Sequence, residues 1–504
     1  MSTETLISPA VRARYEAVIG LEVHVQLQTR SKIFCSCSTR FGDPANSNTC
    51  PVCLGLPGAL PVLNREAVTM ALKAALGLGC RINYSSRFAR KNYFYPDLPK
   101  GYQISQYDQP LAGHGRLDIE VDGNRKSIGI TRVHLEEDAG KSLHEGFADS
   151  DSTSYIDLNR SGVPLIEIVS EPDLRSPEEA YQYLSRLKTT MLYLEVSDCN
   201  MEEGSLRCDA NVSVRLRGVA QFGTKTEVKN VNSFRFIQKA LAYEIERQID
   251  IVAAGGEVTQ ETRLWDSREQ RTYGMRSKEF AHDYRYFPEP DLPPLVISEE
   301  WLEEVRATLP ELPQAKEDRF LRQYGLPPQD IQLLISSRAM ADYFEEVARL
   351  SGEPKVAANW VLNDLIFLMK RMEHDGTIYL LEQSTGSTFS PPVQPDALAE
   401  LIGFVAKGVI TGKIAKDVLE QMVLRGQKAS AVIAEKNLAQ ISDPEKIAAA
   451  ARHVIAANPK QVEQYRSGKT AALGWFVGQV MKATRGQANP QMVQEILKRE
   501  LSAA

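Results

Sequence analysis

The sequence predicts an α+β protein in which a strand-rich domain precedes an all-helical domain and a small helical tail. Up to about Ser298, short segments alternate apolar and polar residues and are separated by glycines and tight turns. After Trp301, nearly every segment repeats its apolar residues with helical period. The change falls at Pro288–Ser298, where four prolines exclude a continuous helix. Because 504 residues exceed a single hydrophobic core, we expect domains at residues 1–298, 299–392 and 393–504.

Composition and charge exclude several classes of protein. The chain is 43% hydrophobic and 25% charged, as globular proteins are, and has no run of eighteen apolar residues to cross a membrane. The N-terminal segment lacks the features of a signal or transit peptide, so we expect a cytoplasmic location. The net charge is −6, but residues 393–504 carry +5 and the remainder −11. This asymmetry suits cation binding in the first part and polyanion contact by the tail, although a solvated helical surface explains the tail's charge almost as well.

The first predicted strand, Val18–Leu27, separates an apolar face from a polar one. Glu22 and His24 point away from the face formed by the alternating leucines and valines. Side chains two residues apart on a strand stand about 7 Å apart, and a carboxylate and an imidazole can both ligate a metal or move a proton. The alternative is the solvent-exposed face of an edge strand.

Four of the seven cysteines follow as two close pairs, Cys35-x-Cys37 and Cys50-x-x-Cys53. In a cytoplasmic chain this spacing is typical of a tetrahedral zinc site rather than of disulfides. Four thiolates leave no open coordination position, so we expect structural Zn²⁺ that pins a knuckle at residues 35–53. The other three cysteines lie in apolar surroundings and are predicted to be buried: Cys80, Cys199 and Cys208.

Capping residues predict three helices in the first domain, because Asn and Ser accept bonds from the free amides at a helix start and Gly ends helices. These helices run from Asn64 to about Leu78, from Ser176–Pro177 onward, and from Ser233 to Gly255–Gly256. Between the first two, the aromatic-rich segment 90–107 contains Lys91 and Lys100, which can line a polar path or bind an anion. A plain loop held by its aromatic side chains explains this segment equally well. Residues 157–173 are predicted as two strands about a Gly-x-Pro turn.

Two later strands repeat the polar face of the first. A hairpin turning at Asp122–Gly123 leads to Glu136, Glu137 and Asp138, and the strand from Cys208 turns Asp209 outward. Unpaired carboxylates repel one another, and a divalent cation relieves this repulsion. Six side chains can thus form one acidic floor in a cleft, with scattered surface charge as the rival explanation: Glu22, His24, Glu136, Glu137, Asp209 and Glu227. Oxygen-rich ligands with one histidine favour Mg²⁺ or Mn²⁺, and neighbouring lysines suit nucleotide phosphates.

The second half is predicted to be helical. Strong helical patterns cover residues 327–350 and 356–372, and a Ser-, Thr-, Gly- and Pro-rich loop at 384–395 separates them from the tail. The SGKT segment at 467–470 is not a phosphate loop, because position 463 is a glutamate and no strand precedes it. The tail consists of short helices whose basic side chains suit contact with backbone phosphates. These residues are Lys460, Arg466, Lys469, Lys482, Arg485, Lys498 and Arg499.

Seven long, irregular motifs carry a resemblance to a known family. They are VIGLEVHVQL, RKNYFYPDLPKGYQISQ, HLEEDAGK, DLNRSGVPLIEIVSEPD, MEEGSLRCDANVSVR, HDYRYFPEPDLPPL and KATRGQANPQMV. From about Glu16 to Leu501, the chain resembles the B subunits of the aspartyl/glutamyl-tRNA amidotransferases. The short stretch between Pro294 and Lys355 leaves no room for the insertion of the archaeal relatives, so the bacterial or organellar type is the better match.

The resemblance implies an ATP- and Mg²⁺-dependent ligase. Members of the family phosphorylate the side-chain carboxylate of glutamate or aspartate on mischarged tRNA(Gln) or tRNA(Asn), and ammonia then displaces the phosphate. The ammonia comes from the glutaminase site of an amidase A subunit, and a small C subunit stabilises the pair in a heterotrimer. The family's fold is a catalytic cradle of strands, a helical domain and a small tail that touches the outer corner of the tRNA.

The same resemblance assigns roles to residues of this sequence. It implies that the catalytic cleft is formed by the six side chains of the predicted acidic floor. Within that set it implies Mg²⁺ on Glu22, His24, Glu137 and Glu227, and it implies an ammonia path at Lys91 and Lys100. Some members lack the zinc knuckle, but all four cysteines are present here. Which of the two consecutive glutamates, 136 or 137, binds metal and which guides ammonia stays open, as does the choice between the two charged tRNAs.

Two other functions also stay open. A non-enzymatic, zinc-containing tRNA-binding or assembly protein would hold structural cations on its acidic faces and consume no ATP. A stand-alone synthetase-like ligase would act without partner subunits, but no synthetase signature is present. Consumption of ATP that depends on mischarged tRNA separates the enzyme from the binding protein.

Overall fold

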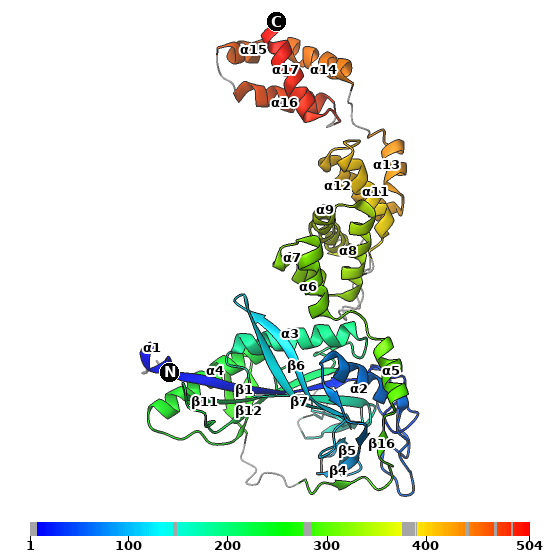
Figure 1. Cartoon of the computed structure of the whole chain (residues 1–504), viewed down its shortest axis with the longest axis vertical. Coiled ribbons are helices and arrows are strands. Elements are labelled where there is room, and N and C mark those ends of the chain that lie inside the picture. Colours follow the sequence, from blue (N-terminus) through cyan, green and yellow to red (C-terminus); the bar gives the residue numbers. More distant parts are fainter. Residues whose placement is uncertain are drawn as a thin grey trace. The chain divides into compact units, whose positions relative to one another are not determined.

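A computed structural model describes most of the chain, and Figure 1 shows its elements. The described residues are 8–144, 149–150, 152–275, 284–374, 389, 391–438, 443–467, 471–484 and 487–503. The chain divides into two compact units, the first ending at Lys316 and the second beginning at Glu317. Of the helices in the described ranges, none combines the length and the apolar character that a membrane crossing requires.

The first unit is built on one large, mainly antiparallel sheet. Its strands are β1 (Tyr15–Gln26), β2 (Arg81–Ile82), β4 (Phe88–Asn92), β5 (Tyr102–Gln106), β6 (Ala112–Val121), β7 (Asn124–Glu137), β10 (Pro164–Ser170), β11 (Leu206–Leu216), β12 (Thr226–Lys229), β13 (Thr262–Asp266), β14 (Arg271–Gly274) and β15 (Phe287–Pro288). The main path runs β14-β13-β12-β11-β1-β10-β7-β5-β4-β15, with β6 pairing β7 and β2. Two small sheets pair β3 (Ser85–Ser86) with β16 (Leu295–Val296), and β8 (Lys141–Leu143) with β9 (Tyr155–Asp157).

The predicted alternation of the first strand is confirmed, because Leu21, Val23 and Val25 are buried in the core of this unit. Helices α2 (Arg65–Gly77), α3 (Pro177–Tyr193) and α4 (Phe234–Ala253) pack their apolar side chains into the same core and cover that face of the sheet (Figure 1). A short helix, α1 (Pro9–Arg12), precedes β1. The opposite face of the central strands therefore remains for polar side chains.

The predicted helix starts are confirmed by their caps. Asn64 accepts hydrogen bonds from the amides of Glu66 and Ala67, and Ser233 accepts one from Phe236. Ser176 caps α3 by accepting a bond from Glu179 N–H. In a capping box, the glutamate three residues after the cap bonds back to the cap's own amide, but here the Glu179 carboxylate accepts from the amide of Arg175, one residue earlier.

The β6–β7 hairpin turns where the sequence predicts. Asp122 and Gly123 have φ angles of 52° and 75°, and Val121 pairs with Asn124. Positive φ at both central residues defines a type I′ turn, whose twist matches that of the strands. This hairpin sets the pairing of β6 with β7, and β7 continues from it to Glu136 and Glu137.

The second unit consists of helices. They are α6 (Pro313–Tyr324, which spans the division), α7 (Pro328–Leu334), α8 (Arg338–Ser351), α9 (Pro354–Asn359), the π-helix η1 (Trp360–Leu365), α10 (Ile366–His374), α11 (Pro395–Ala406), α12 (Gly412–Arg425), α13 (Ala429–Glu435), α14 (Pro444–Ala457), α15 (Pro459–Arg466), α16 (Ala471–Ala483) and α17 (Pro490–Ala503). The predicted α+β class is thus confirmed. The helical pattern at 327–350 is interrupted after α7, and that at 356–372 contains a π-helical turn. Most of the predicted loop at 384–395 lies outside the described residues.

The hydrophobic cores divide the chain differently from the predicted domains. Helix α5 (Glu299–Ala307) buries Leu302 and Val305 in the core of the first unit. Val393 and α11–α13 share one core with α8, so residue 393 lies within a packed group of helices. A separate core holds α14, α16 and α17 from Ile447 to Leu501. The amphipathic pattern of a helix shows that it buries one face, but not which core receives it.

Candidate active site

The polar face of the central sheet gathers charged side chains from four strands. Antiparallel pairing places directly opposed residues on the same face. One row across β11, β1, β10 and β7 consists of Arg207, His24, Glu167 and His134, each opposite the next. The row beside it on β11 and β1 pairs Asp209 with Glu22. Strand register, rather than sequence proximity, therefore assembles this site.

Glu136 and Glu167 meet the two histidines in a compact, buried cluster. His24 Nε2 lies 3.3 Å from Glu167 Oε2 and 3.6 Å from Glu136 Oε1. His134 Nε2 lies 3.6 Å from a carboxylate oxygen of each glutamate. Arg132 contributes a further cation 3.3 Å from Glu167. Ligand atoms of His24, Glu136 and Glu167 all lie within 4.8 Å of one another, as the ligands of one metal ion do.

Opposite charges keep the two carboxylates of this cluster ionised despite their burial. Burial opposes protonation of His24, yet its pKa is raised because Glu167 and Glu136 stabilise the imidazolium. Burial likewise disfavours the charged carboxylates, but His134 and His24 outweigh it and lower the pKa of Glu136. The pKa of Glu167 falls for the same reason, through its bond to His24 and the charge of His134. The two carboxylates are therefore already ionised, as binding of a cation or acceptance of a proton requires.

The donor set fits a hard divalent cation. Two carboxylates and one imidazole match the oxygen-rich ligation of Mg²⁺ or Mn²⁺, with room for substrate oxygens and water to complete the shell. Of the four side chains expected to ligate Mg²⁺, only His24 belongs to this group among the described residues. Glu167 takes part although the sequence reasoning did not identify it.

Glu22, Asp209 and Glu227 form a second acidic region on the same face. Glu22 accepts a hydrogen bond of 2.9 Å from Asn211 Nδ2. Its pKa is raised by burial, and the charges of Glu167, Glu227 and Asp209 raise it further. Lys229 lies 2.9 Å from Asp209 and 3.2 Å from Glu227, and its pKa is raised because these carboxylates outweigh its burial. The region therefore carries excess negative charge that one lysine only partly offsets.

Glu137 faces the opposite side of the sheet from Glu136. Successive strand residues point to opposite faces, and Glu137 forms an ion pair with Lys100 and accepts a 2.8 Å bond from the amide of Ile104. Its carboxylate lines a cavity of about 200 Å³ together with Lys32 and Cys53. The expectation of a single acidic floor is therefore corrected for this residue, because the strand period of two separates the consecutive glutamates.

The two lysines expected on an ammonia path lie in different surroundings. Lys100 pairs with Glu137 in the buried cavity. Lys91 Nζ instead lies over aromatic rings, 4.9 Å from the centroid of Tyr284 and 5.7 Å from that of Tyr93. Within the described ranges, neither a hydrogen bond nor an ion pair joins Lys91 to the carboxylate cluster.

Asp138 anchors the end of β7 through three partners. Arg207 lies 2.9 Å from its carboxylate, Arg160 lies 3.7 Å away, and Gln26 Nε2 donates a 2.7 Å bond. The two guanidinium groups overcome the effect of burial and lower the pKa of Asp138. Because Arg207 pairs with His24 in the strand register, these contacts hold the row that carries the imidazole.

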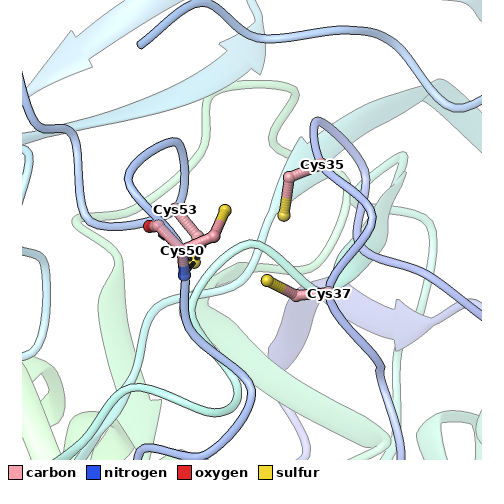
Figure 2. Close-up of side chains that lie close together, drawn as sticks. All are labelled: Cys35, Cys37, Cys50 and Cys53. Atoms are coloured by element: carbon pink, nitrogen blue, oxygen red, sulfur yellow. Dashed lines mark hydrogen bonds between the residues drawn. The ribbon is translucent and has the colours of Figure 1, made fainter.

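The four cysteines of the knuckle converge, as Figure 2 shows. Their sulfur atoms all lie within 4.8 Å of one another, although they come from two separate turns of the chain. The pKa of the Cys53 thiol is lowered because a hydrogen bond with the Cys35 thiol and another from the amide of Cys50 stabilise the thiolate. A tetrahedral thiolate set of this kind fits Zn²⁺. The predicted burial of Cys80, Cys199 and Cys208 is confirmed.

The basic tail residues are exposed where the structure describes them. Lys460 and Arg466 lie on α15, Lys482 on α16, and Lys498 and Arg499 on α17. Arg499 lies 3.5 Å from Glu500, and the other four form no ion pair with another described residue. Lys469 and Arg485 lie outside the described residues.

Sequence reasoning did not assign Glu167, His134 or Arg207 to the site. A signal was present for Glu167, since it is the one charged residue in the buried apolar run Pro164–Ser170. A lone carboxylate there requires a partner, because an unpaired buried charge is costly. Which side chains become the partners of Glu167 depends on the strand order, which places β10 between β1 and β7.

Comparisons with known proteins agree with this architecture. The family model described as the GatB/GatE catalytic domain matches residues 17–303, and the one described as the GatB domain matches residues 342–501. A protein of Carboxydothermus hydrogenoformans is 57% identical over 97% of this chain and 99% of its own length. Proteins of Caldanaerobacter subterraneus subsp. tengcongensis and Syntrophotalea carbinolica are each 54% identical over 97% of this chain, covering 100% and 99% of their lengths.

All three relatives are named as the B subunit of aspartyl/glutamyl-tRNA(Asn/Gln) amidotransferase. The match covers nearly the whole of each protein, and the matched catalytic domain contains every side chain of the buried cluster. The chain therefore belongs to the family of aspartyl/glutamyl-tRNA(Asn/Gln) amidotransferase B subunits.

Proposed function

We propose that this chain is the B subunit of an ATP-dependent amidotransferase that converts glutamate or aspartate on a mischarged tRNA into its amide. The observation that carries the proposal is the convergence of His24, Glu136 and Glu167 on the polar face of the matched catalytic domain. A carboxylate is a poor acyl donor because its oxide does not leave, and phosphorylation by ATP creates the leaving group. The protein's task is to bind both substrates, order the acceptor oxygen and keep water away.

In this proposal His24, Glu136 and Glu167 hold Mg²⁺. When bound there, Mg²⁺ neutralises charge on a transferring phosphoryl group and orients the reacting oxygens. Glu22, Asp209 and Glu227 serve as further cleft residues, where Lys229 offers its ammonium to phosphate oxygens. The buried His134 and the partly exposed Arg132 keep the carboxylates oriented. This arrangement supports Glu136, rather than Glu137, as the metal ligand.

Glu137 and Lys100 are proposed to act on ammonia. Ammonia is largely ammonium at neutral pH, and only the neutral amine attacks an acyl phosphate. The Glu137 carboxylate, in its cavity beside Lys100, is placed to accept a proton from arriving ammonium. We propose that the ammonia comes from an amidase A subunit with glutaminase activity, and that a small C subunit completes the heterotrimer. The position of Lys91 among tyrosines supports a lesser role for it in this path.

The direct test of the proposed function is ATP hydrolysis by the chain with its A and C partners, Mg²⁺ and glutamine. We expect Glu-tRNA(Gln) or Asp-tRNA(Asn) to stimulate hydrolysis over uncharged tRNA, with the amide as product. Glu136→Gln should lower this stimulated rate about 100-fold or more, because an anionic ligand of the proposed Mg²⁺ is lost. Glu171→Gln, which changes an exposed carboxylate beyond β10, is the matched control. Tight tRNA binding without any ATP turnover would instead favour the binding-protein alternative.

A second prediction separates the two consecutive glutamates. Glu137→Gln should leave charged-tRNA-stimulated ATP hydrolysis within about twofold of the native rate but lower amide formation about 100-fold, since proton acceptance by such a group typically contributes 10²–10⁴. The activated carboxylate is then hydrolysed by water instead. The ratio of amide formed to ATP consumed measures this uncoupling. An unchanged ratio would contradict the assignment of Glu137.

We further propose structural Zn²⁺ at the four-cysteine knuckle. Elemental analysis of the purified chain should find about one zinc per chain, because four clustered thiols form a closed tetrahedral site. The double variant Cys50→Ser with Cys53→Ser should lose the zinc and lower the temperature of thermal unfolding. Cys80→Ala, which changes a buried cysteine outside the knuckle, should keep it. Full zinc content in the double variant would contradict the site.

The tail is proposed to contact the tRNA backbone through its exposed lysines and arginines. Deletion after Leu438 removes the separate core of α14–α17 and leaves the core shared by α8 and α11–α13 intact. We expect tRNA affinity to fall and its salt dependence to become shallower, by about 0.7 to 0.9 in log–log slope for each phosphate that the shortened chain no longer binds. ATP hydrolysis at saturating tRNA should change little. Unaltered affinity and slope would refute the role of the tail.

A further inference from the structure

Lys32 is a fully buried lysine whose positive charge meets no carboxylate in the described part of the chain. Its ammonium donates hydrogen bonds to two backbone carbonyls instead, 2.7 Å to that of Asn48 and 3.3 Å to that of Leu158. Carbonyl groups satisfy hydrogen-bond donors but carry no net charge, and a buried ion without a counter-charge is costly. The fold therefore needs a negative charge near Lys32 that the ion pairs of the described ranges do not supply.

The carboxylates that share a cavity with Lys32 are paired with other cations. The cavity of about 200 Å³ is lined by Lys32 and by two carboxylates, those of Glu137 and Asp291. Glu137 forms its ion pair with Lys100, and Asp291 lies 3.2 Å from a guanidinium nitrogen of Arg90. Each carboxylate thus already has a cationic partner, and the charge of Lys32 is left over.

Lys32 contacts both turns of the four-cysteine knuckle. Its backbone amide donates a 3.0 Å bond to the carbonyl of Cys37, and its ammonium bonds the carbonyl of Asn48, two residues before the second cysteine pair. A Cβ placed on Gly162 would lie 3.5 Å from Lys32 Cδ and 3.6 Å from Cys53 Cβ, so these two side chains approach the same point. Lys32 is therefore held beside the cysteine cluster by its main chain and by its side chain.

The proposed zinc site carries a charge of the opposite sign. Four thiolates bring four negative charges, and Zn²⁺ neutralises two of them. Groups around the ligands of a metal commonly change its affinity about 10- to 100-fold, because they orient the ligands and stabilise their charge. An ammonium has three N–H donors, and the two carbonyls use two of them, so the third is available to a thiolate sulfur.

We propose that Lys32 is a positioning residue of the zinc site, whose buried ammonium compensates the charge of the zinc–thiolate centre and strengthens zinc binding without ligating the ion. The inference rests on the proposed zinc site and not on the proposed reaction. Zinc and Lys32 then stabilise each other, since the ion gathers the thiolates that compensate the lysine, and the lysine offsets the repulsion between the thiolates. This explains why a lysine occupies a fully buried position between the knuckle and the cavity of Glu137.

The test measures the zinc affinity of the purified full-length chain by competition with a chelator. Lys32→Gln and Lys32→Met should each lower this affinity about tenfold or more, because both remove the charge. Lys32→Gln keeps amide donors for the two carbonyls, so it separates loss of charge from loss of hydrogen bonds. The matched control is Lys316→Gln, which should bind zinc as the native chain does, because Lys316 is also buried but lies on α6 and pairs with Glu311.

A second arm changes the charge of the site itself. Cys37→His replaces one thiolate by a neutral imidazole, which also ligates Zn²⁺, so the centre carries one negative charge fewer. Cys37 is only partly buried, which leaves room for the ring. Lys32→Gln should then lower zinc affinity several-fold less in the Cys37→His chain than in the native chain. An equal loss in both chains would show that Lys32 acts on the shape of the knuckle alone and would overturn the charge assignment.

Thermal unfolding of each variant, with and without zinc, identifies any that fail to fold, and if Lys32→Met does so, Lys32→Gln carries the comparison. A zinc affinity of Lys32→Gln equal to that of Lys316→Gln would overturn the role of Lys32, as would a loss of affinity confined to Lys32→Met. A native chain that binds no zinc would refute the zinc site and the role of Lys32 together. Charged-tRNA-stimulated ATP hydrolysis tests the proposed reaction separately.

Discussion

The antiparallel register of β1 with β10 and β11 is the constraint on which the rest of the site depends. It sets His24 opposite Glu167 on one side and opposite Arg207 on the other. A slip of one residue would turn every polar side chain of β1 toward α2, α3 and α4, and every core residue toward the cleft. The hydrophobic face thus specifies the register, and the register specifies which charges meet. The same strand pairing therefore determines both the packing of the core and the set of charges in the site.

The charges brought together in this way would be unfavourable one at a time. Glu136, Glu167 and His134 are almost completely buried, and an isolated ion there would lose its hydration without compensation. The cluster is tolerated because each carboxylate contacts an imidazole and Arg132 adds a further positive charge. Such a network fixes its members in one geometry. A preorganised set of this kind needs little rearrangement when a cation or a phosphoryl group arrives.

The end of β7 separates two kinds of chemistry by a single residue. Glu136 reaches the histidines on the polar face, and Glu137 reaches Lys100 and the cavity that Cys53 also lines. The zinc knuckle therefore forms part of the wall around Glu137. Zn²⁺ bound by the four cysteines would hold this loop in place and keep the shape of the cavity independent of the loop's own packing. The same loop carries Phe41, which lines a different cavity of about 380 Å³.

Local signals in the sequence determined the elements of this protein. Alternating residues predicted β1, the Asp122–Gly123 pair predicted the hairpin, Asn64 and Ser233 predicted the helix starts, and the cysteine spacing predicted the convergence of four thiols. These features depend on neighbours within a few residues, so a linear pattern contains them. The long motifs also identified the family, which the comparisons confirm.

Only the tertiary structure decided which residues meet. The α+β class followed from the pattern. The acidic floor stays a prediction, and Glu137 lies on the other face of the sheet from Glu136 because consecutive strand residues alternate. Glu167 joined the site through the position of β10 between β1 and β7, and no pattern in a single segment records strand order. The cores of the second unit show the same limit, since α11 packs with α8 across a long interval of sequence. Sequence determines what each segment is, because propensity and periodicity act locally; structure determines its neighbours, because long-range pairing is settled by the burial of all segments together.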